Sequence, residues 1–268
     1  MRWLTILLLG LWASIARAEY HDGKTEVDLE LLLLVDVSRS MSPAEQEIQR
    51  RGYAEALASD DVIEAILGGL TGRIALSYVE WAGSYSIRTV VGWTLIGAGE
   101  DARAFADRIG SSQLASMQRT SISGALRFGM VTLRDNDFRG LRRVIDISGD
   151  GPNNEGGPVV PDRNRAVAEG IIINGLPLMT RDGQGSRWYL EDLDEYYRAC
   201  VIGGPGAFVL PVLRWEEFAP AIKRKLILEI AGRQPERLWQ AQATAPAGYD
   251  CLVGEKRWER MRRIYDLP

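Results

Sequence analysis

Five side chains with oxygen donors stand out because of where they fall in the chain. Asp36, Ser38 and Ser40 end one apolar run, Thr120 lies in a polar loop before a helical pattern, and Asp150 follows a second apolar run. Alternate residues of an extended chain point the same way, so Asp36, Ser38 and Ser40 share one side. Carboxylates and hydroxyls without histidine or thiol favour Mg²⁺, Mn²⁺ or Ca²⁺ over zinc.

Each group also has an ordinary structural interpretation. Asp36 to Ser40 suits a strand that runs into a capped helix. A threonine placed like Thr120 is often a helix N-cap, because its hydroxyl satisfies a free backbone N–H. Asp150 with Gly151 is a common turn. Together and in this order, the five residues favour a metal site. Since Mg²⁺ readily keeps waters in its shell, they would leave a position for water or for a partner's carboxylate.

Three further residues near these positions are weaker candidates. Asp146 lies inside the second apolar run and is as well suited to pair with Arg142 or Arg143. Glu80 and Trp81 come late in another expected strand. They could reach the rim of the site, and ordinary edge positions suit them better.

The spacing of apolar residues predicts alternating strands and helices, which indicate an α/β fold. The run at 27–37 is typical of a strand buried on both faces, and Ser42 with Glu45 makes a capping box for a helical region at 42–66. Further strands are expected at 72–83, 86–96, 142–151, 171–178 and 207–213, and further helices at 99–112, 121–135, 162–170, 190–201 and 214–232.

The expected architecture is a three-layer α/β/α sandwich with a mostly parallel central sheet and helices on both faces. The short turn near Gly83 predicts an antiparallel pair at a sheet edge. Because ligands of open α/β sheets bind outside the carboxyl ends of the strands, the loops that carry the five residues can converge there.

These residues resemble a known family. Asp36 to Ser40 resembles the D-x-S-x-S motif of von Willebrand factor A domains, which forms their metal-ion-dependent adhesion site. "RTSISGAL" is similar to the family's loop with a metal-linked threonine, here Thr120, and "ISGDG" to its second acidic stretch, here Asp150. The resemblance covers about residues 27–232, and its nearest branch is the bacterial, exported domain of unknown function 1194. One departure is Arg119, where the family usually has glycine.

The resemblance implies a role in binding. A divalent cation, foremost Mg²⁺, would accept an acidic side chain from a partner protein, without chemical turnover. Two alternatives remain open. A metal-dependent hydrolase would use the same oxygens to activate water, although no obvious general base is present. A structural subunit would use the metal only to stabilise the rim, or would lack it.

The first eighteen residues are typical of a secretory signal peptide. One early cation and an apolar run precede Ala16-Arg17-Ala18, which predicts cleavage before Glu19. A membrane anchor is the alternative, but the run falls short of the roughly 20 apolar residues that a span needs. No later segment is long and apolar enough, so we expect an exported protein, periplasmic or secreted.

The balance of charge argues against one class of partner. The chain has 32 basic and 36 acidic side chains, which opposes nucleic-acid binding because phosphates require a basic face.

Cys200 and Cys251 predict a disulfide in an exported chain, with two buried thiols as the alternative. Residues 233–268 form a linker and a basic helical tail, which suits a solvated face better than a site for acidic partners or lipid headgroups.

Overall fold

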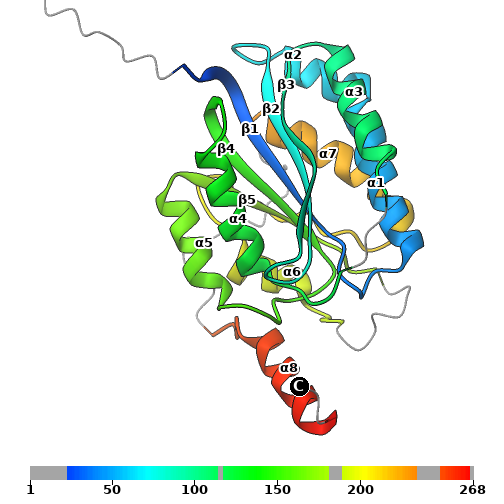
Figure 1. Cartoon of the computed structure of the whole chain (residues 1–268), viewed down its shortest axis with the longest axis vertical. Coiled ribbons are helices and arrows are strands. Elements are labelled where there is room, and N and C mark those ends of the chain that lie inside the picture. The colour runs from blue at the N-terminus through cyan, green and yellow to red at the C-terminus, as the bar shows by residue number, and fades with distance from the viewer. Residues whose placement is uncertain (1–22, 114–116, 181–188, 234–247, 266–268) are drawn as a thin grey trace, which may run out of the picture.

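A five-stranded sheet in the order β3-β2-β1-β4-β5 forms the middle of the molecule (Figure 1). The structure, a computed structural model, describes residues 23–113, 117–180, 189–233 and 248–265. Its strands are β1 (Thr25–Asp36), β2 (Ile74–Trp81), β3 (Ile87–Ile96), β4 (Phe138–Gly149) and β5 (Ile171–Pro177). All neighbouring strands pair in parallel except β3, which pairs antiparallel with β2 at one edge. The mostly parallel sheet and its antiparallel edge confirm the prediction.

The central strand β1 is buried on both faces, and its sequence shows why. Leu29, Leu31 and Leu33 point into one hydrophobic core, whereas Leu32 and Leu34 point into the other. A strand covered on both sides needs apolar residues at consecutive positions, because neighbouring side chains face opposite layers. The run of leucines therefore places β1 at the centre of the sheet. Its end lies at the centre of the edge formed by the carboxyl ends of the parallel strands, which we call the rim.

Helices cover both faces, as expected for a three-layer sandwich (Figure 1). The first core lies beneath α1 (Pro43–Leu57), α2 (Asp60–Leu67), α3 (Gly99–Gly110) and α7 (Phe218–Ile230). The second lies beneath α4 (Ile122–Arg134), α5 (Val159–Ala168) and the short α6 (Leu193–Tyr196). Residues 197–201 continue α6 as a π-helical turn, and a 3-10 turn at 215–217 precedes α7.

The predicted capping box begins α1. The Ser42 hydroxyl accepts a hydrogen bond from the Glu45 backbone N–H, and the Glu45 carboxylate accepts one from the Ser42 N–H. Pro43 occupies the first turn, where a missing N–H costs nothing. The helical region expected at 42–66 is interrupted at Ser59, whose backbone is extended, and α2 follows as a separate helix.

The strand expected at 207–213 does not form. This segment runs beside β5 and makes only isolated bridges, Gly175 to Val209 and Leu178 to Val212. The Gly175 carbonyl accepts from the Leu210 N–H, and the Pro177 carbonyl accepts from the Val212 N–H. The bond between these two would need a donor at residue 177, and Pro177 has no backbone N–H, so the ladder is interrupted there.

A disulfide joins the C-terminal part of the chain to the body. The sulfurs of Cys200 and Cys251 are 1.99 Å apart, and α8 (Val253–Tyr265) follows directly. In Figure 1, α8 extends from the lower end of the molecule. Within the described ranges, no helix is both long and apolar enough to span a membrane. The predicted signal peptide at 1–18 and most of the predicted linker lie outside those ranges.

Candidate functional site

Four of the five predicted site residues are joined by hydrogen bonds at the ends of β1 and β4. Asp36 ends β1, and its Oδ1 accepts a hydrogen bond from the Ser38 backbone N–H at 2.7 Å. The hydroxyls of Ser38 and Ser40 are 2.8 Å apart. The Ser40 hydroxyl donates to Asp150 Oδ1 at 2.7 Å. The strand register explains this meeting, because β1 and β4 run in parallel and end side by side.

Thr120 reaches the same rim on a separate loop. The Met117 N–H donates to the Val37 carbonyl at 3.1 Å, so this loop runs beside the stretch after β1. Asn154 holds the Thr120 backbone on both sides. Its Oδ1 accepts from the Thr120 N–H at 2.9 Å, and its N–H donates to the Thr120 carbonyl at 2.8 Å. The structure thus places this loop beside the stretch that follows β1, and the Thr120 hydrogen bonds described here run through its backbone.

The two carboxylates of the site are short of positive partners. Asp36 is fully buried, and within the described part of the chain its Oδ2 has no hydrogen-bond partner. Burial, followed by the negative charge of Asp150, raises the pKa of Asp36 well above its usual value. Burial, with a contribution from the charge of Glu45, raises the pKa of Asp150 to about 6. A cation between these carboxylates would favour their charged forms.

The donor set fits a hard divalent cation. A buried carboxylate oxygen without a partner calls for an explanation such as a bound ion, and Asp36 Oδ2 is such an atom. Hydroxyls and carboxylates are ligands that Mg²⁺, Mn²⁺ and Ca²⁺ accept. No group of three or more His, Cys, Asp or Glu able to hold a metal occurs among the described residues. A metal at this rim therefore depends on the serine and threonine hydroxyls.

Asp146 belongs to a different cluster, below the rim. Its partner is neither Arg142 nor Arg143, as the sequence suggested, but Lys225 of α7, whose Nζ lies 2.7 Å from Asp146 Oδ1. The same Nζ lies 2.5 Å from Glu229 Oε1. Burial, followed by the charge of Asp146, raises the pKa of Glu229 to about 7. These ion pairs join α7 to β4, and the Asp146 carboxylate contacts Lys225 rather than the residues at the rim.

Glu80 and Trp81 end β2, an inner strand of the sheet, so the edge position considered from the sequence is wrong, and Trp81 pairs in register with Asp36 at the end of β1. Both side chains are 0% exposed. Glu80 forms ion pairs with Arg50 of α1 and with Arg88 of β3. Two arginines offset the cost of burying this carboxylate, so its role is to join α1 to the edge strand.

Two residues that hold the site escaped the sequence interpretation. Asn154 fixes the Thr120 backbone, as described above. Asn153 accepts a hydrogen bond from the Ser123 N–H at 3.1 Å and donates to Glu255 of α8 at 2.7 Å. The available signal was a pair of asparagines just after Asp150, because asparagine side chains often bond to nearby backbone groups in turns.

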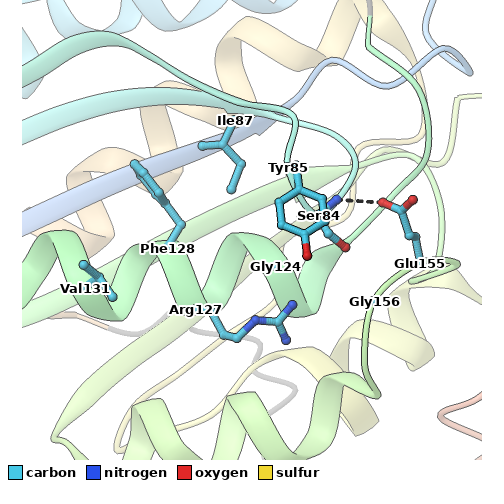
Figure 2. A pocket seen from close by; sticks show the side chains of 9 residues that line it. All are labelled: Ser84, Tyr85, Ile87, Gly124, Arg127, Phe128, Val131, Glu155 and Gly156. Atoms are coloured by element: carbon cyan, nitrogen blue, oxygen red, sulfur yellow. Dashed lines mark hydrogen bonds between the residues drawn. The ribbon is translucent and has the colours of Figure 1, made fainter.

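A hollow of about 610 Å³ flanks the Thr120 loop. Figure 2 shows it between the turn after β2, the outer side of α4 and the loop at 155–156. Phe128, Ile87 and Val131 supply apolar lining. Glu155 accepts a hydrogen bond from the Ser84 N–H at 2.7 Å, which ties the two loops that border the hollow.

Comparisons with known proteins agree with this architecture. Residues 26–234 match the family described as "Protein of unknown function (DUF1194)". A von Willebrand factor type A structure from Catenulispora acidiphila is similar, with 14% identity and a TM-score of 0.52 over 76% of this chain and 43% of that one. A search among proteins with curated descriptions found no match.

Two further solved structures share the fold. Proximal thread matrix protein 1 from the mussel byssus has 17% identity and a TM-score of 0.54. The pilus adhesin SpaC from Lactobacillus rhamnosus GG has 13% identity and a TM-score of 0.56. Each match covers 78% of this chain, but only 49% of the mussel protein and 31% of the adhesin. This chain therefore shares the von Willebrand factor A-like fold with part of each larger protein.

Proposed function

The chain belongs to the DUF1194 family and has a von Willebrand factor A-like fold, and from this premise we propose that it is an exported, divalent-cation-dependent protein-binding domain. In this proposal the cation sits at the rim where β1 and β4 end, and an acidic side chain of a partner protein completes its coordination. Mg²⁺ is the proposed cation, with Mn²⁺ and Ca²⁺ as possible replacements.

The observation that carries the proposal is the buried, unpartnered Oδ2 of Asp36 beside hydroxyls that are already aligned. Asp36, Ser38, Ser40, Thr120 and Asp150 are the proposed ligands, some of them through water. The bound cation would supply a positive charge that accepts a carboxylate. Because hydroxyls leave much of that charge unneutralised, a partner's carboxylate would gain more here than at a site rich in acidic ligands.

Binding is favoured over hydrolysis because, apart from the proposed ligands, the described residues offer no free base at the rim. No histidine occurs among the described residues, and His21 lies outside them. The Glu45 carboxylate caps α1 and accepts a hydrogen bond from the Trp215 indole N–H at 3.1 Å. The Glu155 carboxylate accepts from the Ser84 N–H. A general base must reach the water that it activates, and both carboxylates are otherwise engaged.

The proposal includes where the protein acts and how it is divided. Cleavage of residues 1–18 would release the chain into the periplasm or the medium, and the disulfide between Cys200 and Cys251 suits such an oxidising compartment. Residues 27–232 would form the binding domain, and residues 233–268 a linker and tail. Neither nucleic acid nor a stable membrane span is part of the proposal.

Capture from the exported protein fraction tests the proposed function. Immobilised wild-type chain is incubated with that fraction in Mg²⁺ or in chelator, beside Asp150→Ala and the control Asp107→Ala on the exposed side of α3. We expect one or more proteins to be retained by the wild type and the control in Mg²⁺, and lost with chelator or with Asp150→Ala. Retention that ignores both the chelator and Asp150→Ala would contradict the proposal.

A further inference from the structure

The residue before Thr120 has an unusual backbone conformation. Arg119 has φ 74°, and among the described residues it is the only non-glycine with a positive φ. Side chains with a Cβ avoid this left-handed region. A residue stays there only when its surroundings hold it. Something must therefore hold Arg119, and through it the backbone that carries Thr120.

The side chain of Arg119 stacks on the C-terminal helix. Its guanidinium carbon lies 3.7 Å from the centroid of the Trp258 ring on α8. Among aromatic side chains, Trp offers the most favourable ring for a cation–π contact, and Arg is the more frequent cation. The contact joins the loop at 117–121 to a helix that follows more than a hundred residues later in the chain.

A second contact between α8 and the rim lies close to the first. The Asn153 side chain donates to Glu255 Oε1 at 2.7 Å and accepts from the Ser123 N–H in the first turn of α4. Gly254 packs so closely that a Cβ added there would lie 2.0 Å from the Asn153 carbonyl oxygen. Thus α8 lies against both loops that border the site, the one with Thr120 and the one after Asp150.

Covalent and polar contacts keep α8 in this place. The disulfide between Cys200 and Cys251 ends two residues before the helix begins. Arg257 donates to the Tyr189 carbonyl at 2.8 Å. A solvated tail would need none of these contacts. The helix is attached at the point where its first two turns reach the rim.

We infer that α8 is a positioning element of the rim site, in which the stack of Arg119 on Trp258 holds the Thr120 loop in the conformation that receives the cation. Arg119 and Trp258 are positioning residues, because neither is a ligand. The inference rests on the proposed function for the cation. The hold on the loop is a property of the protein itself and can be measured without metal.

Two measurements on the full exported chain test the inference. Hydrogen exchange of the backbone amides at 117–121, without metal, reports how firmly the loop is held. Titration with Mg²⁺ reports the affinity of the rim. We expect Trp258→Ala to speed the exchange and to weaken Mg²⁺ binding about fivefold or more, from the usual strength of a cation–π contact. Trp258→Phe, which keeps a ring for the guanidinium, should retain most of the protection of these amides and most of the affinity for Mg²⁺.

A double-mutant cycle separates positioning from general loss of structure. Arg119→Gly accepts the left-handed conformation without strain and removes the stack. In the Arg119→Gly background, Trp258→Ala should change neither the amide exchange rate at 117–121 nor the affinity for Mg²⁺. Arg260→Ala, on an exposed position of α8, is the control and should match the wild type. Gly254→Ala, which pushes the helix away from Asn153, should reproduce Trp258→Ala.

The outcomes distinguish this inference from the proposed function. Exchange at 117–121 that Trp258→Ala leaves unchanged overturns the inference. The inference is also overturned if Trp258→Ala has the same effect in the wild type and in the Arg119→Gly variant, because α8 would then act without the stack. If the wild type binds no Mg²⁺ while the exchange cycle behaves as expected, the proposed function fails and the hold of α8 on the loop stands.

Discussion

Replacing Lys225 by methionine removes a cation from the interior while keeping the length of its side chain. Lys225 is 0% exposed, and its Nζ contacts Asp146 Oδ1 at 2.7 Å and Glu229 Oε1 at 2.5 Å. The variant leaves two buried carboxylates without that positive charge. Breaking a buried ion pair on one side costs about 3–5 kcal/mol, so we expect a loss of that size in the free energy of unfolding at pH 8.

The pH dependence gives the sign of the effect. The pKa of Glu229 is raised from 4.5 to about 7 in the folded protein, so between these values the folded state binds more protons than the unfolded state. Stability in the wild type therefore falls as pH rises through this window, by on the order of 3 kcal/mol from this group. Without Lys225 the pKa of Glu229 should rise further. The penalty of Lys225→Met should therefore be smaller at pH 5, where Glu229 is protonated, than at pH 8.

Urea unfolding followed by circular dichroism at pH 5 and pH 8 measures this penalty. Lys223→Met is the matched control, because Lys223 is 43% exposed and pairs with the exposed Asp61, a surface pair worth about 0–1 kcal/mol. Glu229→Gln should flatten the wild-type slope between the two pH values. A Lys225→Met variant within about 1 kcal/mol of the wild type at pH 8, or one with a larger penalty at pH 5, would refute this reasoning.

Three further predictions concern the rim and the supports around it. A Cβ at Gly149 would lie 3.0 Å from Asp36 Oδ2 and 2.9 Å from the Tyr197 hydroxyl, so Gly149→Ala should displace Asp36 and weaken Mg²⁺ binding by calorimetry, while the far-ultraviolet circular dichroism stays native. Cys251→Ser opens a disulfide that spans 51 residues, which should lower the free energy of unfolding by about 4 kcal/mol in urea; an unchanged midpoint would contradict it. Ser42→Ala removes the cap of α1 and should cost about 1 kcal/mol in the same assay.

Much of the fold follows from local patterns in the sequence. The leucines of β1 predict a strand buried on both faces, and the structure places that strand at the centre of the sheet. Ser42 and Glu45 predict the start of α1. These signals work because strand burial and helix capping depend on residues only a few positions apart. The segment at 207–213 shows the limit. Its apolar residues suit a strand, but Pro177 opposite it lacks the N–H that a continuous ladder needs, and only isolated bridges form.

The supports of the site could not be predicted in the same way. Asp146 meets Lys225 from a helix far along the chain, and Arg119 stacks on Trp258 from one farther still. No local spacing records such pairs, because each depends on how α7 and α8 pack against the sheet. The sequence of the basic tail predicts a solvated face, yet Trp258 and Glu255 contact Arg119 and Asn153 in the loops at the rim. The sequence motifs identify the proposed residues at the rim, whereas only the structure shows the elements that hold them.

Titration calorimetry of the wild-type chain with Mg²⁺, beside Asp36→Asn, tests the central claim most directly. Asparagine has nearly the shape of aspartate but no negative charge. The variant therefore removes the charge of the carboxylate whose Oδ2 has no hydrogen-bond partner among the described residues. We predict one Mg²⁺ per chain in the wild type, and no measurable binding in Asp36→Asn at equal thermal stability of the metal-free proteins. Wild-type chain that binds no Mg²⁺, Mn²⁺ or Ca²⁺, or a variant that binds as the wild type does, would contradict the account.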